Sequence, residues 1–248
     1  FTGAVTVQGN FSADGGTIKL DGNYPVGTSN VALGNTALDN VEAGGNYNIA
    51  IGDSAGTALT TGDQNTFVGS FSGIATVTTS DNTGLGLSSL RANTGSNNTA
   101  LGSQALRSNT TASNNTAVGY QAGYLNTTGV NNLSLGYQAG YTNATGNYNT
   151  TVGTQSLANN TGSNNVALGQ SALYSNTTAS NNTTVGYKAG FSNTTGFLNA
   201  FGSHAAQAQT TGANTTAIGS FSLYSNTTGS NNTAVGSAFE TTLGVLQS

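Results

Sequence analysis

Several residue types that usually stabilise folds or carry chemistry are missing from this chain. It has no cysteine, no methionine and no tryptophan, and it has one histidine, His204, and one proline, Pro25. Without cysteine there is neither a disulfide nor a thiolate ligand for a metal ion. Charged residues make up 5% of the sequence, against roughly 25% in an ordinary soluble domain.

The scarcity of charge and of long apolar runs excludes two classes of partner. Four lysine and arginine residues are too few to neutralise the phosphates of a nucleic acid, so we predict no nucleic-acid partner. No run approaches the roughly 18 apolar residues of a membrane span, so we predict no membrane insertion. Stability is expected to come from hydrogen-bonded stacking and from association between chains.

A low share of hydrophobic residues does not make this chain a disordered one. That share is 35%, below the usual value of roughly 45–50%. Disorder also requires a high net charge or a featureless sequence. Here the net charge is −4 and the apolar residues recur on a strict period. The sequence therefore predicts a folded repeat protein.

The repeat is a short apolar unit that follows a pair of asparagines and ends in glycine. It reads Asn-Asn-Thr-Ala-Val-Gly over residues 114–119 and again over residues 231–236. Thirteen units follow one another at spacings of 16 to 18 residues, which is too short for the helical repeat families. The closing glycines are Gly34, Gly52, Gly69, Gly86, Gly102, Gly119, Gly136, Gly153, Gly169, Gly186, Gly202, Gly219 and Gly236.

Two alternating positions of each unit are apolar, which is the pattern of a short strand. The residue before each glycine is always apolar, and the residue two positions earlier is mostly β-branched or apolar, as in Ile49 and Thr116. Alternate residues of a strand share a face, so we expect both positions to point into the core. The residue between them is small in twelve units, with Phe67 the exception, and is expected to lie outside. The predicted structural core before the glycines is Leu33, Ile51, Val68, Leu85, Leu101, Val118, Leu135, Val152, Leu168, Val185, Phe201, Ile218 and Val235.

A second short strand is expected after each glycine. The third residue after the glycine is Ala or Ser in twelve of the thirteen units, which would let two strand layers approach closely. The next residue is often Leu or Gly and the one after it often aromatic; a polar turn follows, typically Asn-Thr-Thr-Gly, because glycine tolerates the positive φ of such turns. The aromatic residues at this position include Tyr124, Tyr141, Tyr174, Phe191 and Tyr224.

Coils of this kind predict an all-β fold, a parallel β-roll or solenoid of about thirteen coils of 16–18 residues. At about 4.8 Å per stacked strand the rod would be roughly 60 Å long. The repeats occupy residues 29–239, while residues 1–28 are expected to form a β adaptor or the end of a preceding shaft, and residues 240–248 a cap or linker. Because the predicted core is thin, we expect the recurring Leu and Tyr residues to pack between copies of the chain.

One block of the repeat resembles a known family. The sequence Asn-Asn-Thr-Ala-Val-Gly-Tyr-Gln-Ala-Gly at residues 114–123 has close copies at 131–140 and 181–190. It resembles the head repeat of trimeric autotransporter adhesins of the YadA type and the related repeats of bacteriophage tail fibres. The resemblance implies a left-handed parallel β-roll that assembles as a homotrimer. The longer period and the Asn-Thr-Thr-Gly turn are more similar to the tail fibres than to the adhesin heads.

Groups that could carry catalysis are sparse. His204 is the single imidazole and is expected to be a solvated loop residue, so one chain builds neither a Cys–His pair nor a His cluster. Seven of the eight carboxylates lie before residue 82, and their order along the chain defines no close acid pair. A calcium site among them stays open, although the calcium-binding repeat is absent. We predict no catalytic residue, no metal site and no cofactor. The seven carboxylates are Asp14, Asp21, Asp39, Glu42, Asp53, Asp63 and Asp81.

The leading hypothesis is that the chain is no enzyme but a structural and adhesive segment of a trimeric phage tail fibre, a rigid spacer that takes part in host-surface attachment. Its partners would be two further copies of itself, other fibre or tail proteins, and a host cell-surface glycan or protein, and its location extracellular, in the virion. The alternative is a bacterial cell-surface adhesin head of the same fold. An ice-binding solenoid and a depolymerase are weaker alternatives. The Tyr and Phe residues after the glycines are candidates either for contacts between chains or for stacking on sugars.

Overall fold

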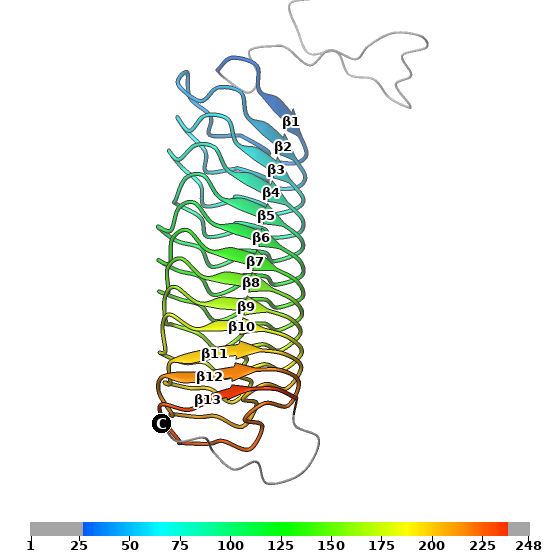
Figure 1. The fold of residues 1–248 in the computed structure, drawn as a ribbon. Helices are drawn as coiled ribbons and strands as arrows, with labels where there is room; N and C mark the ends of the chain where they lie inside the picture. The colour runs from blue at the N-terminus through cyan, green and yellow to red at the C-terminus, as the bar shows by residue number, and fades with distance from the viewer. Residues whose placement is uncertain (1–26, 238–248) are drawn as a thin grey trace, which may run out of the picture.

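A computed structural model of the protein describes residues 27–237, which wind into one straight β-solenoid (Figure 1). Each coil contributes one short strand, and the thirteen strands form a single parallel sheet in sequence order. Coils are numbered here by their strands, so that coil 6 begins with β6. Among these residues there is no helix. The prediction of an all-β parallel solenoid is therefore confirmed.

The strands are short and evenly spaced along the chain. Parallel pairing is in register from coil to coil, as where Thr116 lies beside Leu133. Twelve strand-to-strand steps of about 4.8 Å give a rod of about 58 Å. The strands are β1 (Val31–Leu33), β2 (Ile49–Ile51), β3 (Thr66–Val68), β4 (Thr83–Leu85), β5 (Thr99–Leu101), β6 (Thr116–Val118), β7 (Leu133–Leu135), β8 (Thr150–Val152), β9 (Val166–Leu168), β10 (Thr183–Val185), β11 (Leu198–Phe201), β12 (Thr215–Ile218) and β13 (Thr233–Val235).

Two of the predicted segments are not covered by this description. The adaptor or shaft end at residues 1–28 and the cap or linker at residues 240–248 lie wholly or almost wholly outside the described residues. The repeat array predicted for residues 29–239 is described as far as residue 237.

The second strand that we expected after each glycine is not formed. The second and fourth residues after the glycine have positive φ in all twelve coils described at these positions, for example 54° at Gln121 and 58° at Gly123. An extended strand needs negative φ, so the return segment is a chain of turns. It still bonds to its neighbour, since Gly123 N donates to Ala139 O at 2.9 Å and Leu125 N donates to Tyr141 O at 2.9 Å.

The predicted inside and outside of the strand are reversed. The middle residue points into the solenoid: Ala117 is 0% exposed, and even Phe67 is 0% exposed. The residues before the glycines, which we expected in the core, point outward. Six of these are exposed, namely Leu33, Ile51, Leu85, Phe201, Ile218 and Val235, and seven are half-buried, namely Val68, Leu101, Val118, Leu135, Val152, Leu168 and Val185.

The narrowness of the interior explains this reversal. A Cβ built on Gly84, in the middle of β4, would lie 2.6 Å from Ser72 Oγ in the return segment of the previous coil. Only small side chains fit between layers this close, so the larger Val, Leu and Ile face out. Phe67 is accommodated because Gly56 and Gly73, which lie beside its ring, carry no side chain.

The fourth residue after the glycine completes the apolar core. Leu106 is 2% exposed, and a Cβ on Gly123 in the next coil would lie 2.8 Å from a Leu106 methyl group. Leucine in one coil therefore takes the space that glycine leaves in the next. The leucines at this position belong to the core of one chain, so our expectation that they pack between chains is wrong. Those that are buried are Leu38, Leu90, Leu106, Leu157 and Leu173.

The interior is closed on one side by a ladder of buried asparagines. The asparagine directly before the strand in coils 1 to 10 directs its side chain inward, and its Oδ1 accepts a hydrogen bond from the backbone N–H of the same position in the next coil. Asn132 N donates to Asn115 Oδ1 at 2.9 Å, and Asn115 N donates to Asn98 Oδ1 at 3.0 Å. This ladder comprises Asn30, Asn48, Asn65, Asn82, Asn98, Asn115, Asn132, Asn149, Asn165 and Asn182.

A second asparagine ladder holds the polar turn. Asn126 Nδ2 donates to Asn109 Oδ1 at 2.8 Å and to the Gly129 carbonyl of its own turn at 2.9 Å. Asn109 Nδ2 in turn donates to Asn93 Oδ1 at 2.7 Å. The Asn-Thr-Thr-Gly signature thus reflects a buried amide that bonds its own turn and the neighbouring coil at once.

Removing one buried amide should destabilise the rod strongly. Asn115→Ala would leave Asn132 N without a partner and would remove one of the two side-chain amides that donate to the Gly129 carbonyl. We expect a loss of roughly 1–3 kcal/mol, because an unsatisfied buried group costs about that much. Urea denaturation followed by circular dichroism measures it. Asn114→Gly is the control: Asn114 is exposed with φ of 60°, which glycine tolerates, and a similar loss there would contradict the ladder.

The closing glycines are required because of their positive φ and because of their contact with the next coil. One pair of variants separates these two effects. A Cβ on Gly119, at φ 131°, would lie 2.5 Å from Gly136 O. Gly236 has φ of 140°, but no atom of residues 27–237 lies within 4 Å of the corresponding Cβ. Both Gly→Ala changes carry backbone strain, of order 1–3 kcal/mol, and only Gly119→Ala adds an overlap with the next coil. We expect Gly119→Ala to lower the thermal midpoint by several degrees more than Gly236→Ala; equal effects would rule out the steric account.

Candidate binding surfaces

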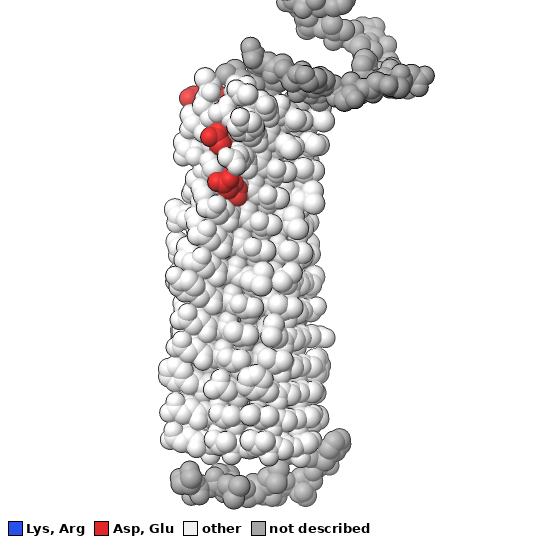
Figure 2. All heavy atoms as spheres, turned by 45° about the horizontal axis from the view of Figure 1, so that its top comes forward, with Lys and Arg blue, Asp and Glu red and all other residues white. Residues whose placement is uncertain are grey.

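Acidic residues gather at the N-terminal end of the rod, where they take part in coil stacking. Figure 2 shows the carboxylates near this end and no Lys or Arg on the same face. Asp63 Oδ1 accepts from Asn46 N at 2.6 Å, and Asp53 Oδ1 accepts from Asn35 Nδ2 at 3.2 Å. Within residues 27–237 no three His, Asp or Glu side chains lie close enough to hold a metal ion. The calcium alternative therefore has no cluster of three acidic side chains in the described part of the chain.

The outer face of the sheet, called the sheet face here, carries an apolar stripe. It consists of the residue directly before each closing glycine, together with the residue two positions earlier where that residue is apolar, as in β1, β2, β7 and β9. Leu85 is 48% exposed and Ile218 is 40% exposed, and Ile49 and Ile51 are exposed on β2. The stripe runs from β1 to β13 with at least one apolar side chain per coil. A continuous apolar surface of this length is typical of a protein interface.

The strand threonines also lie on the sheet face, which corrects our expectation that they point inward. Thr99 and Thr116 are half-buried on this face. The position is taken by Ile49, Leu133 and Val166 in other coils. The threonines therefore form no unbroken row of hydroxyl groups, which is the feature that an ice-binding surface would need.

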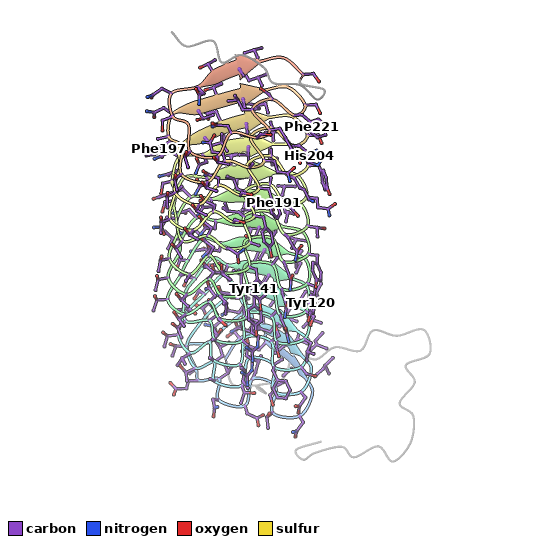
Figure 3. All side chains as sticks on the ribbon, turned by 90° about the horizontal axis from the view of Figure 1, so that it is seen from below. Tyr120, Tyr141, Phe191, Phe197, His204 and Phe221 are labelled. Atoms are coloured by element: carbon purple, nitrogen blue, oxygen red, sulfur yellow. The ribbon has the colours of Figure 1, made fainter. Side chains whose placement is uncertain are left out.

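The predicted aromatic residues lie together on the return segments, in a column that we call the ring column. The ring column consists of the fifth residue after each closing glycine. The ring centroids of Tyr124 and Tyr141 are 5.1 Å apart with the planes at 5°, and Tyr174 and Phe191 have the same spacing and angle. Figure 3 places Tyr120, His204 and Phe221 along one edge of the rod and Phe197 at the opposite edge. The ring column comprises Asp39, Thr57, Ile74, Arg91, Arg107, Tyr124, Tyr141, Ala158, Tyr174, Phe191, Gln207 and Tyr224.

Stacking along the rod axis decides which ring surfaces are accessible. Tyr124 and Tyr141 cover each other's facing surfaces, as do Tyr174 and Phe191. A sugar that stacks on an aromatic ring needs a free ring face, so the inside of each pair is closed to it. Only a face that looks away from its stacked partner can receive a ligand.

Cationic side chains cap two of these stacks. Arg107 Nη1 donates to the Tyr124 hydroxyl at 2.8 Å, and its guanidinium carbon lies 5.5 Å from the Tyr124 ring centroid. Lys188 Nζ lies 5.6 Å from the centroid of Phe191 and 5.3 Å from that of Tyr187. Both are cation–π distances, so the outer ends of the two stacks are occupied by the chain's own cations.

A glutamine ladder beside the rings was not predicted from the sequence. The second residue after the glycine is glutamine in four successive coils, and Gln121 Nε2 donates to Gln104 Oε1 at 2.8 Å. Gln138 Nε2 continues the ladder to Gln121 at 2.9 Å, and Gln155 Nε2 donates to Gln138 at 3.2 Å. The sequence signal that could have predicted the ladder was the recurrence of glutamine at 17-residue steps. Stacking of the coils brings these residues close enough to form hydrogen bonds.

His204 is not the solvated loop residue that we expected. Its ring stacks on Phe221 at 4.6 Å and 8°, meets Tyr187 edge-on at 5.0 Å, and its Nδ1 lies 2.8 Å from Ser203 Oγ. Tyr224, the last of the predicted aromatic candidates, lies against this group, 5.4 Å from Phe221. The imidazole therefore acts as one more ring of an aromatic cluster on coils 10 to 12.

Comparisons with known proteins add no relationship to this geometry. The chain matches no family model, no curated protein and no solved structure. Residues 27–237 contain no helix that is long and apolar enough to cross a membrane.

The stacked rings should be energetically coupled. Replacing Tyr174 and Phe191 by leucine, singly and together, forms a double-mutant cycle for a pair 5.1 Å apart. We expect a coupling free energy of about 0.5–1.5 kcal/mol from urea denaturation. The same cycle for Tyr148 and Phe191, which share no ring contact among the described residues, should be additive within about 0.5 kcal/mol; equal coupling in both cycles would show that stacking is not the cause.

Proposed function

We propose that this chain is the structural and adhesive segment of a trimeric, extracellular fibre of the phage tail type, a rigid spacer that also contacts a host surface. The observation that carries this is the unbroken sheet of thirteen strands paired in register. Bending such a rod breaks hydrogen bonds in the sheet and in the asparagine ladders together, and a buried amide that loses its partner is costly. A stiff rod of about 58 Å is suited to holding a binding surface away from a particle.

The sheet face supplies the reason for self-association. Its apolar side chains remain half-buried or exposed in the single chain, and covering them with another apolar surface is favourable. The stripe repeats with every coil over the full set of strands. A partner that covers it must have the same repeat and the same length, and a second copy of this chain has both.

We infer the trimeric state from the family resemblance of residues 114–123. Three rods whose sheet faces meet at a common axis would bury all three stripes and leave the return segments outside. The rings, the glutamine ladder and the cations would then form the outer surface of the fibre, available to a host glycan or protein. The same assembly would serve as a bacterial surface adhesin head, which the same block of residues also supports.

Light scattering of the full chain tests the assembly. We expect the mass of three chains and an elongated shape. Leu85→Asp with Ile218→Asp places carboxylates on two exposed positions of the sheet face. This double variant should have the mass of one chain and an unchanged circular dichroism spectrum, because an unpaired charge buried at an interface is costly.

A matched variant controls for added charge. Thr128→Asp with Thr178→Asp adds two carboxylates on exposed turns outside the sheet face, and the mass of three chains should persist. A single-chain mass for the unaltered protein would overturn the fibre assignment.

A further inference from the structure

The ring column is interrupted at coil 8. Tyr124 and Tyr141 occupy coils 6 and 7, and Tyr174 and Phe191 occupy coils 9 and 10, while coil 8 has Ala158. Strands β7, β8 and β9 pair in register, so Ala158 lies between Tyr141 and Tyr174 along the rod. It is 6% exposed, at the base of this position. The column thus lacks one ring and has an aromatic side chain on each side of the gap.

Toward the gap, each flanking ring has a face on which no other ring of the described chain stacks. Tyr141 is covered by Tyr124 on the side away from the gap, and Tyr174 is covered by Phe191 on the side away from it. No ring contact joins Tyr141 to Tyr174 among residues 27–237. Unlike the outer ends of the two stacks, which Arg107 and Lys188 cap, these faces have no cation over them in the described chain.

The width of the gap selects a kind of ligand. Two coil steps separate the rings by about 10 Å. A planar ring in van der Waals contact with both would need only about 7 Å, from two contacts of about 3.5 Å. A saturated six-membered ring is thicker, because it carries C–H groups on both faces. A pyranose with only equatorial substituents, such as a β-glucoside, presents C–H groups to both tyrosines and its hydroxyls to the sides.

A polar side chain is available for those hydroxyls. Gln155 is the second residue after the glycine in coil 8, three residues before Ala158. The same two positions are in contact in coil 10, where Lys188 Nζ is 5.6 Å from the Phe191 ring centroid. By this correspondence the Gln155 side chain adjoins the position of Ala158, with its Nε2 directed to Gln138 Oε1 in coil 7.

Gln155 is also the last member of the glutamine ladder. Its Nε2 is engaged with Gln138 Oε1 in coil 7, and coil 9 has Ser171 at the next position. No further glutamine therefore donates to Gln155 Oε1, and a ligand hydroxyl can do so. Saccharide sites of this type combine apolar walls with a few placed polar groups.

We propose that the gap at Ala158 binds one pyranose ring of a surface saccharide between Tyr141 and Tyr174, with Gln155 bonded to an equatorial hydroxyl. Ala158 forms the floor, and its small side chain keeps the site open. This inference rests on the proposed attachment role, since it names a ligand for the outer surface of the fibre. Binding of a single sugar ring is weak, with a dissociation constant on the order of millimolar.

A second interruption of the ring column provides an internal control. Gln207 lies between Phe191 and Tyr224 in coil 11. Its larger side chain fills that position, and its Oε1 is buried without a hydrogen-bond partner in the described chain. Only coil 8 combines a small residue with an aromatic ring on each side.

The test is titration of the full chain with cellotriose, a trimer of β-linked glucose, observed by saturation-transfer NMR and calorimetry. Ala158→Tyr completes the ring column, as tyrosine does in coils 6, 7 and 9, and should abolish binding while both flanking rings remain. Gln207→Tyr adds a tyrosine at the same repeat position and should leave binding unchanged. Tyr174→Leu should weaken binding at least about tenfold. Methyl β-galactoside, which has an axial hydroxyl on one face, should bind more weakly than methyl β-glucoside.

Three results would overturn the proposal. These are no binding to the unaltered chain, unchanged binding to Ala158→Tyr, or equal binding of the two methyl glycosides. A change in the mass of Ala158→Tyr by light scattering would instead assign the gap to a contact between chains. A trimeric rod that fails to bind cellotriose would refute this inference alone, because the mass measurement tests the fibre independently.

Discussion

Hydrogen bonding by buried asparagine amides sets the geometry on which the rest of the rod depends. One short side chain bonds its own coil and the next at once: Asn115 Nδ2 donates to the Ser113 carbonyl while its Oδ1 accepts from Asn132 N. A buried amide left without partners costs more than a made bond contributes. Each coil must therefore place its asparagine at the same position along the coil as the neighbouring coil does. This requirement keeps the period near 17 residues and makes neighbouring coils nearly identical.

The same ladders limit what the chain can bury. Amide columns occupy two sides of a narrow interior, so the space that is left takes only residues such as Ala117, the leucines of the return segment and, once, Phe67. The larger apolar side chains of the strands are displaced to the sheet face. The single chain thus forms its hydrogen bonds internally but buries its apolar surface only in part, and self-association follows from that imbalance.

The sequence predicts the period, the strands and the solenoid correctly, because glycine and asparagine mark each corner of the coil. It does not decide which strand face is inside, since both faces of units such as residues 116–118 are apolar and alternation shows only that they differ. Side-chain volume decides which face lies inside, because the strand and the return segment lie too close together for large side chains between them. The prediction of a second strand was wrong because the positive φ of residues such as Gln121 and Leu106 is imposed by the stacking of coils and not by residue type. The gap at Ala158 was not predicted from the sequence, because Ala158 lies between two aromatic residues only once the coils are stacked.

Stacking also explains why the chain has so little charge. Every side chain lies about 4.8 Å from the same position in the next coil, and like charges that close repel by about 1 kcal/mol even in water. Arg91 and Arg107 are successive cations in one column, and Arg107 is engaged with the Tyr124 hydroxyl. Amides, hydroxyls and aromatic rings stack favourably instead. A rod built under this constraint has rings and amides with which to recognise a partner, and these suit a neutral, hydroxyl-rich ligand better than an ionic one.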